Sequence, residues 1–118
     1  MKLISIQDVA PYGFTLYFLA YTSEDPPEEN LRSVNIREWV WKRPYTTLEL
    51  QHIPGAQLEP LEDQGIGVEC VELEVPSNAV QDIGAALQSN DFEFEELSKD
   101  FMIRITDPDG TKLVLKHE

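Results

Sequence analysis

Basic residues are scarce in this chain of 118 residues, where nine lysines and arginines stand against 22 aspartates and glutamates and the formal net charge is −13. Such a chain offers no positive surface to a phosphate backbone, so we expect no binding to nucleic acid. Docking on an anionic membrane is disfavoured for the same reason. Because the apolar fraction of 42% is that of an ordinary globular domain, the acidity predicts solubility rather than disorder.

Cysteines and long apolar runs are also lacking. The single cysteine, Cys70, cannot form an internal disulfide, so nothing indicates an oxidising compartment. No segment approaches the roughly 20 apolar residues of a membrane span. The N-terminus carries no apolar stretch of signal-peptide length. We therefore expect one domain, residues 1–118, located in the cytoplasm.

The charges are unevenly distributed along the chain. No lysine or arginine lies between Arg43 and Lys99, a stretch that holds twelve aspartates and glutamates. Four of the nine basic residues fall just before it, at positions 32, 37, 42 and 43. This polarity favours association of two copies, and it is equally typical of a solvated acidic face.

Alternating apolar residues and turn residues divide the chain into short elements. Strands are predicted over residues 2–8, 14–21, 46–52, 66–75, 92–97, 101–106 and 112–117. A helix is predicted to start at residues 76–78, because an apolar stripe at helical spacing follows. Segment 31–43 fits either a helix or a strand, and its Trp39 and Trp41 fit strand alternation.

The order of these elements predicts an α+β fold of two modules. Residues 66–118 form a complete β-α-β-β-β module. Residues 1–65 supply only three strands, as though an initial strand and helix were absent, so the first module is incomplete.

Three segments resemble a known family. Residues 14–21 (F-T-L-Y-F-L-A-Y), Thr47–His52 (T-L-E-L-Q-H) and the D-P-D-G turn at 107–110 resemble glyoxalase I (lactoylglutathione lyase), of the vicinal oxygen chelate superfamily. The resemblance covers nearly the whole chain. It implies paired β-α-β-β-β modules that form a glyoxalase/bleomycin resistance-like half-barrel around a divalent metal, zinc or nickel.

The resemblance also assigns the metal ligands, one from each of four strands. The first ligand's strand would precede Met1, and Glu49 matches the second ligand. The third position, a histidine in the family, is Cys70 here. The fourth, a glutamate that also acts as the base, is Val114. Only one ligand of the family's set is retained, so the resemblance implies a degenerate metal site.

Other residues are candidates for the same cavity. A thiolate at Cys70 is a soft ligand that suits zinc, and the alternative is a packed side chain. Glu72 and Glu74 lie on the strand face of Cys70, either as replacement ligands or as a polar cavity wall. Gln51 and Val114 are expected to line the cavity with them. His52 points to the face opposite Glu49 by alternation.

Two functions follow as hypotheses. One is a glyoxalase I-like, metal-dependent lyase with an altered ligand set. The other is a non-catalytic protein of the bleomycin-resistance type, which binds cationic small molecules in an acidic cavity lined by Glu49, Glu72 and Glu74, with Trp39 or Trp41 stacking on them. The sequence does not distinguish this binding function from a purely structural or partner-binding role. The scarcity of basic residues argues against glutathione conjugates as ligands.

The absent helix would cover the sheet face that carries Leu48 and Leu50. Three explanations remain for how this apolar face is covered. The segment 31–43 folds over the face, a second chain covers the face, or Met1 is an internal methionine of a longer protein. We favour the second account, a homodimer, because the superfamily builds its cavities from paired modules.

Overall fold

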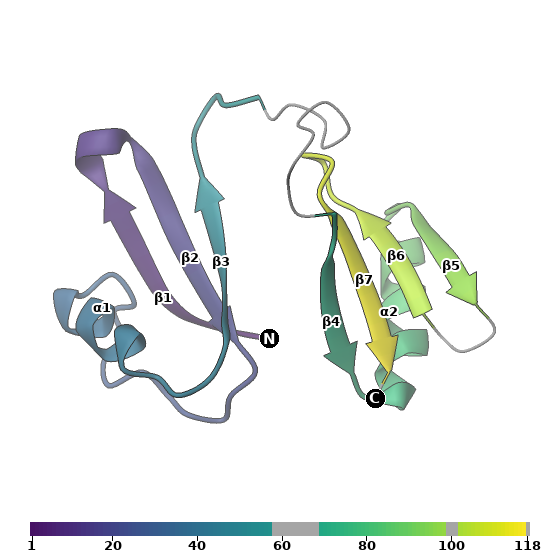
Figure 1. Ribbon diagram of the computed structural model, residues 1–118, viewed down its shortest axis with the longest axis horizontal. Coiled ribbons are helices and arrows are strands. Elements are labelled where there is room, and N and C mark those ends of the chain that lie inside the picture. Colours follow the sequence, from purple (N-terminus) through teal and green to yellow (C-terminus); the bar gives the residue numbers. More distant parts are fainter. Residues whose placement is uncertain (58–68, 99–101, 118) are drawn as a thin grey trace. The chain divides into compact units, whose positions relative to one another are not determined.

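Seven strands and two α-helices make up the part of the chain that the computed structural model describes, residues 1–57, 69–98 and 102–117 (Figure 1). These elements fall into two units, Met1–Ala56 and Gln57–Glu118. The module boundary predicted at residues 65 and 66 lies outside the described residues. No helix in the described ranges is long and apolar enough to cross a membrane.

The first unit holds a three-stranded antiparallel sheet in the order β1-β2-β3. Its strands are β1 (Lys2–Val9), β2 (Phe14–Ala20) and β3 (Thr47–His52). A 3-10 helix, Ala10–Tyr12, joins the first two strands, and Gly13 follows it with φ of 69°. A residue without a Cβ takes this left-handed conformation at little cost, so the turn residues predicted here close the β1–β2 hairpin.

The ambiguous segment 31–43 contains a helix, α1 (Val34–Trp41). Ser33 caps it, because its hydroxyl accepts a hydrogen bond from the backbone N–H of Asn35 at 3.3 Å. Ile36 and Val40 lie four residues apart and are buried, so they occupy one helix face. The helical alternative for this segment is therefore correct.

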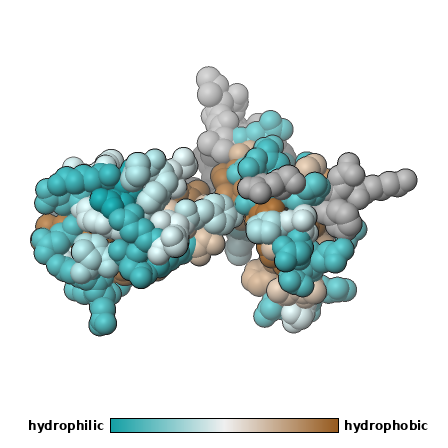
Figure 2. Space-filling model, turned by 90° about the horizontal axis from the view of Figure 1, so that it is seen from below, coloured by the Kyte–Doolittle hydropathy of each residue, from teal (hydrophilic) through white to brown (hydrophobic). Residues whose placement is uncertain are grey.

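Polar contacts tie α1 and the loop before it to β1. The hydroxyl of Thr15 donates to Oδ1 of Asp8 at 2.9 Å, and the guanidinium of Arg32 donates to Oδ2 at 2.9 Å. Arg37 of α1 donates to the backbone carbonyl of Asp8 at 3.0 Å. The Thr15 hydrogen bond, with help from Arg32, lowers the pKa of Asp8. Hydrophilic side chains cover most of the face of this unit that Figure 2 shows.

The α1 helix lies against one face of the sheet. Val40 packs in a cluster with Phe18 and Ala20. In the β2–β3 ladder Phe18 pairs with Glu49, and Leu19 pairs with Leu48. Directly paired residues share a face, so Leu48 lies on the face opposite α1. Residues 31–43 therefore do not supply its cover, and the first of the three accounts is wrong.

The second unit holds a four-stranded sheet in the order β4-β7-β6-β5. Its elements are β4 (Val71–Val75), α2 (Ser77–Ser89), β5 (Phe94–Ser98), β6 (Met102–Thr106) and β7 (Lys112–His117). β4 pairs with β7 in parallel, and the other pairs are antiparallel. The predicted β-α-β-β-β order is confirmed.

Two predicted strand starts are wrong by more than one residue. The strand predicted at 66–75 begins at Val71, because its partner β7 starts at Lys112 and Val71 already pairs with Leu113; residues 66–68 lie outside the described ranges. The strand predicted at 92–97 begins at Phe94. Asp91, with φ of 57°, and Phe92 instead end α2, since the Phe92 N–H donates to the Leu87 carbonyl at 2.9 Å.

One face of the second sheet packs against α2, which lies behind the sheet in Figure 1. The buried residues of this cluster come from β4, α2, β6 and β7: Val75, Val80, Ile103 and Leu115. Side chains alternate along a strand, so the residues between these core positions lie on the other face. We call that face, away from α2, the open face.

Shortening Ile36 tests the packing of α1. Ile36→Ala should lower the free energy of unfolding by about 2–5 kcal/mol, because a fully buried side chain leaves a cavity. Val34→Ala in the same helix should change it by less than about 0.5 kcal/mol, because Val34 is 73% exposed. Urea unfolding followed by tryptophan fluorescence measures both. Equal losses would contradict the assigned helix face.

Candidate functional site

The open face of the second sheet carries charged side chains from all four strands. Paired residues place Glu72, Val114, Arg104 and Glu95 in one row across β4, β7, β6 and β5. Glu72 and Glu74 alternate on β4 with Leu73 and Val75, which belong to the core. The structure therefore brings three predicted site residues, Glu72, Glu74 and Val114, onto one face.

Lys116 of β7 engages both glutamates of β4. Its Nζ lies 2.8 Å from Oε2 of Glu72 and 3.8 Å from Oε1 of Glu74. The Glu72 hydrogen bond is the main reason that the pKa of Lys116 is raised. Lys116 compensates one of the two negative charges, and its ammonium group repels a second cation that approaches these carboxylates.

The predicted third and fourth ligand positions do not supply a metal site. Cys70 is half-buried and directly precedes β4. Val114 is 7% exposed and offers no donor atom, with Glu72 and Arg104 paired on either side of it. Within the described ranges no three His, Cys, Asp or Glu residues gather as a metal would require. This donor set does not fit the divalent metal that the resemblance implies.

Glu49 and Gln51 belong to the first unit and lie on its edge strand β3. Both are exposed, and they pair with Phe18 and Leu16. They therefore lie on the sheet face against which α1 packs. His52 pairs with Thr15 and lies on the other face, as alternation predicts.

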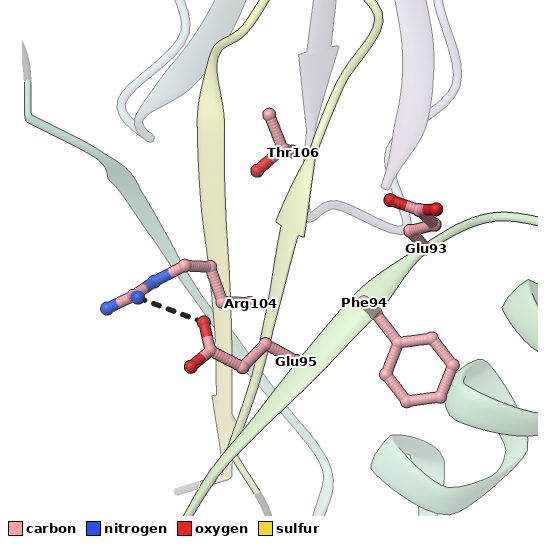
Figure 3. Close-up of a pocket in the computed structure, with 5 residues that line it drawn as sticks. All are labelled: Glu93, Phe94, Glu95, Arg104 and Thr106. Carbon is pink, nitrogen blue, oxygen red and sulfur yellow. Dashed lines mark hydrogen bonds and ion pairs between the residues drawn. The ribbon is translucent and has the colours of Figure 1, made fainter.

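The second sheet also carries a hollow that the sequence pattern did not predict. It has a volume of about 360 Å³ and is lined by Glu93, Phe94, Glu95, Arg104 and Thr106 (Figure 3). The Arg104 guanidinium lies 3.1 Å from Oε2 of Glu95, its partner across the β5–β6 ladder. The ring of Phe94 turns toward α2. The alternation of Glu93 with Glu95 indicates that both side chains lie on one face of β5. It does not show which residues of β6 lie beside them, because that depends on the pairing of β5 with β6.

Comparison with known proteins supports the fold. No protein-family profile matches the chain, and no curated protein sequence matches it. A solved structure of the trypanothione-dependent glyoxalase I of Leishmania major matches with a TM-score of 0.61 and 18% sequence identity, covering 99% of this chain and 68% of that chain. The chain therefore has an α+β, glyoxalase-like fold.

Removing the main partner of Lys116 should change its titration. In Glu72→Gln the pKa of Lys116 should fall toward its ordinary value of 10.5, because the charged form loses its strongest hydrogen bond. Because folding raises this pKa, the protonated side chain of Lys116 stabilises the folded state, fully so below pH 10.5. This stabilisation is lost as the pH rises through the raised pKa. A pH titration of the lysine side chain by NMR measures the change.

The matched control is Glu95→Gln, which removes the carboxylate paired with Arg104 on the same face. It should leave the titration of Lys116 as it is in the parent protein. A Lys116 that titrates alike in the parent and in Glu72→Gln would contradict the pairing.

Proposed function

We propose that this chain binds a small molecule on a glyoxalase-like fold and does not catalyse the metal-dependent isomerisation of glyoxalase I. The observation that carries the proposal is Val114, which occupies the place where the resemblance puts the catalytic glutamate. Moving a proton between adjacent carbons of a hemithioacetal requires a positioned carboxylate and a Lewis acid. A valine side chain neither takes up a proton nor binds a metal.

The neighbouring carboxylates support the same conclusion. Glu72 accepts a hydrogen bond from Lys116 and Glu74 lies 3.8 Å from the same Nζ, so a base or a metal at these carboxylates would stand beside a positive charge. The alternative of an altered metal site built from Cys70 and these glutamates would first have to break the Lys116 ion pairs.

The charges also bear on the ligand. The unit Gln57–Glu118 has four basic and fifteen acidic residues. Two of the basic residues, Arg104 and Lys116, already pair with glutamates. A negative potential of this size repels anions, so glutathione conjugates are disfavoured and neutral or cationic ligands are favoured.

A turnover assay combined with a binding assay tests this function. With zinc or nickel added, the protein should convert the methylglyoxal–glutathione hemithioacetal no faster than buffer does, because no carboxylate occupies the base position. Members of a panel of cationic and neutral aromatic compounds should raise its melting temperature, because a ligand that binds the folded state stabilises it.

An active glyoxalase I provides the positive control for turnover. Metal-dependent turnover well above the buffer rate would refute the proposal. A panel in which no compound shifts the melting temperature would refute its binding half.

We also propose that the protein acts as a homodimer in the cytoplasm. The face of the first sheet opposite α1 carries the apolar residues Leu3, Ile6, Tyr17, Leu19, Leu48 and Leu50. Leu3 is 36% exposed and Leu50 is 50% exposed. An apolar face of this kind marks an interaction surface, and a second copy of the chain is the partner that the resemblance implies.

A single lysine on this face tests the dimer. Leu50→Lys should convert the dimer to a monomer in light scattering coupled to size exclusion, because a charge would be buried without a partner. Val34→Lys, on the exposed side of α1, is the matched control and should remain dimeric. A parent protein that is monomeric at all concentrations would overturn the proposal.

A further inference from the structure

Three of the four edge strands in the described part of the chain carry features that hinder pairing with a further strand. The edges are β1 and β3 in the first sheet and β4 and β5 in the second (Figure 1). An edge strand presents unpaired backbone N–H and C=O groups, which proteins protect with bulges, charges or a covering loop. In β1 the Ile6 N–H already donates to the Leu31 carbonyl at 3.0 Å. Two of the five residues of β4 are glutamates, and β5 contains a register shift.

The fourth edge strand, β3, has none of these features. Its residues pair with β2 in an unbroken register, and it holds one carboxylate, Glu49, and no lysine or arginine. Within the described ranges, residues 47–52 make no backbone hydrogen bond outside the β2–β3 ladder. The four residues from Glu49 to His52 are exposed. β3 therefore presents an open edge to which another strand can be added.

The distribution of charge favours a second copy of this chain as the partner. Met1–Ala56 has five basic and seven acidic residues and a formal charge of −2, whereas Gln57–Glu118 has four basic and fifteen acidic residues and a formal charge of −11. Two copies therefore repel each other least where their first units meet. Pairing through β3 also brings Leu48 and Leu50 of the two copies side by side, which removes part of their apolar surface from water.

A two-fold axis leaves few ways for β3 to pair with itself. Two copies of one strand related by such an axis run antiparallel. Directly paired residues share a face of the sheet, so the axis passes through a residue rather than between two. Axes at Glu49 and at Leu50 each pair five residues of the six-residue strand, 47–51 and 48–52. Any other axis pairs fewer residues of β3.

The side chains distinguish these two registers. With the axis at Glu49, two carboxylates lie directly opposite each other, and like charges in such a pair are destabilising. With the axis at Leu50, two leucines lie opposite each other. Glu49 then lies opposite Gln51, whose amide donates a hydrogen bond to the carboxylate, and Leu48 lies opposite His52. The register centred on Leu50 is therefore favoured.

We infer that two copies of this chain pair through β3, antiparallel and with the two-fold axis at Leu50, and form a continuous six-stranded sheet. The leucines of β3 from the two copies then lie together on the face opposite α1. This inference rests on the proposed homodimer, and it specifies the strand and the register through which the dimer forms.

Cysteine cross-linking tests the register. Cys70→Ser removes the one natural thiol, and Leu50→Cys is added to it. Under oxidation with copper phenanthroline this variant should form a disulfide-linked dimer, because directly opposite residues have Cβ atoms about 4.5–5.5 Å apart, close to disulfide geometry.

The matched control is Leu48→Cys in the same background, on the same strand and the same face. Its two thiols would be four residues out of register, about 14 Å apart along the strand. It should therefore cross-link at least about tenfold more slowly than Leu50→Cys. A mixture of Leu48→Cys and His52→Cys should form the mixed dimer, because these two positions lie opposite each other in the proposed register.

Amide hydrogen exchange tests the pairing in the unmodified protein. As the protein concentration is raised and light scattering reports the dimer, amides of β3 that do not bond to β2 should exchange at least about tenfold more slowly, because they become paired. The amides of β1, at the other edge of the same sheet, should exchange at the same rate at every concentration.

The outcomes separate the edge pairing from the homodimer. Faster cross-linking of Leu50→Cys than of Leu48→Cys, together with slowed exchange in β3, supports the inference. A dimer whose β3 amides exchange as in the monomer, or in which Leu48→Cys cross-links as fast as Leu50→Cys, overturns the inference but leaves the homodimer standing. A protein that is monomeric at all concentrations overturns both.

Discussion

The packing of one helix against one face of each sheet is the constraint on which the rest of this structure depends. In the first unit α1 buries Val40 against Phe18, and in the second α2 buries Val80 against Ile103 and Leu115. Burial of these apolar side chains is the main stabilising term available to such small units. Since side chains alternate along a strand, the choice of the covered face also decides which residues remain available for ligands.

The open face of the second sheet shows what that choice leaves for chemistry. Its charged residues are arranged in cross-strand pairs, Lys116 with Glu72 and Arg104 with Glu95. The side chains of these pairs are 34% to 64% exposed. Water therefore screens their charges, and each pair adds little stability on its own. Each pair places a positive charge beside a carboxylate, and Glu74 shares Lys116 with Glu72. A glyoxalase-like fold thus leaves the chemistry of this face to be set by the side chains that it carries.

The sequence predicted the elements whose pattern is local and strong. Glu72 and Glu74 alternate with Leu73 and Val75, so both the strand and its two faces follow from four residues. The segment 31–43 was ambiguous because the burial of Ile36 and Val40 decides it, and burial depends on a sheet formed by distant residues. The contact of Lys116 with Glu72 spans 44 residues and depends on a parallel pairing that no local pattern encodes. The hollow was missed for the same reason, since Glu95 and Arg104 meet only through the register of β5 with β6.

The net charge acquires a more specific meaning once it is placed on the two units. Met1–Ala56 has five basic and seven acidic residues and is close to neutral, so nearly all of the imbalance belongs to Gln57–Glu118. Solubility alone requires no such division, because charge anywhere on the surface serves it. A concentration of negative charge in the unit that also holds the hollow acts on any ligand that approaches it. Cations are attracted before they make a contact, and anions lose affinity even where Arg104 or Lys116 is near, because each of these already has a glutamate partner. The charge of this unit thus favours cations over anions at its surface.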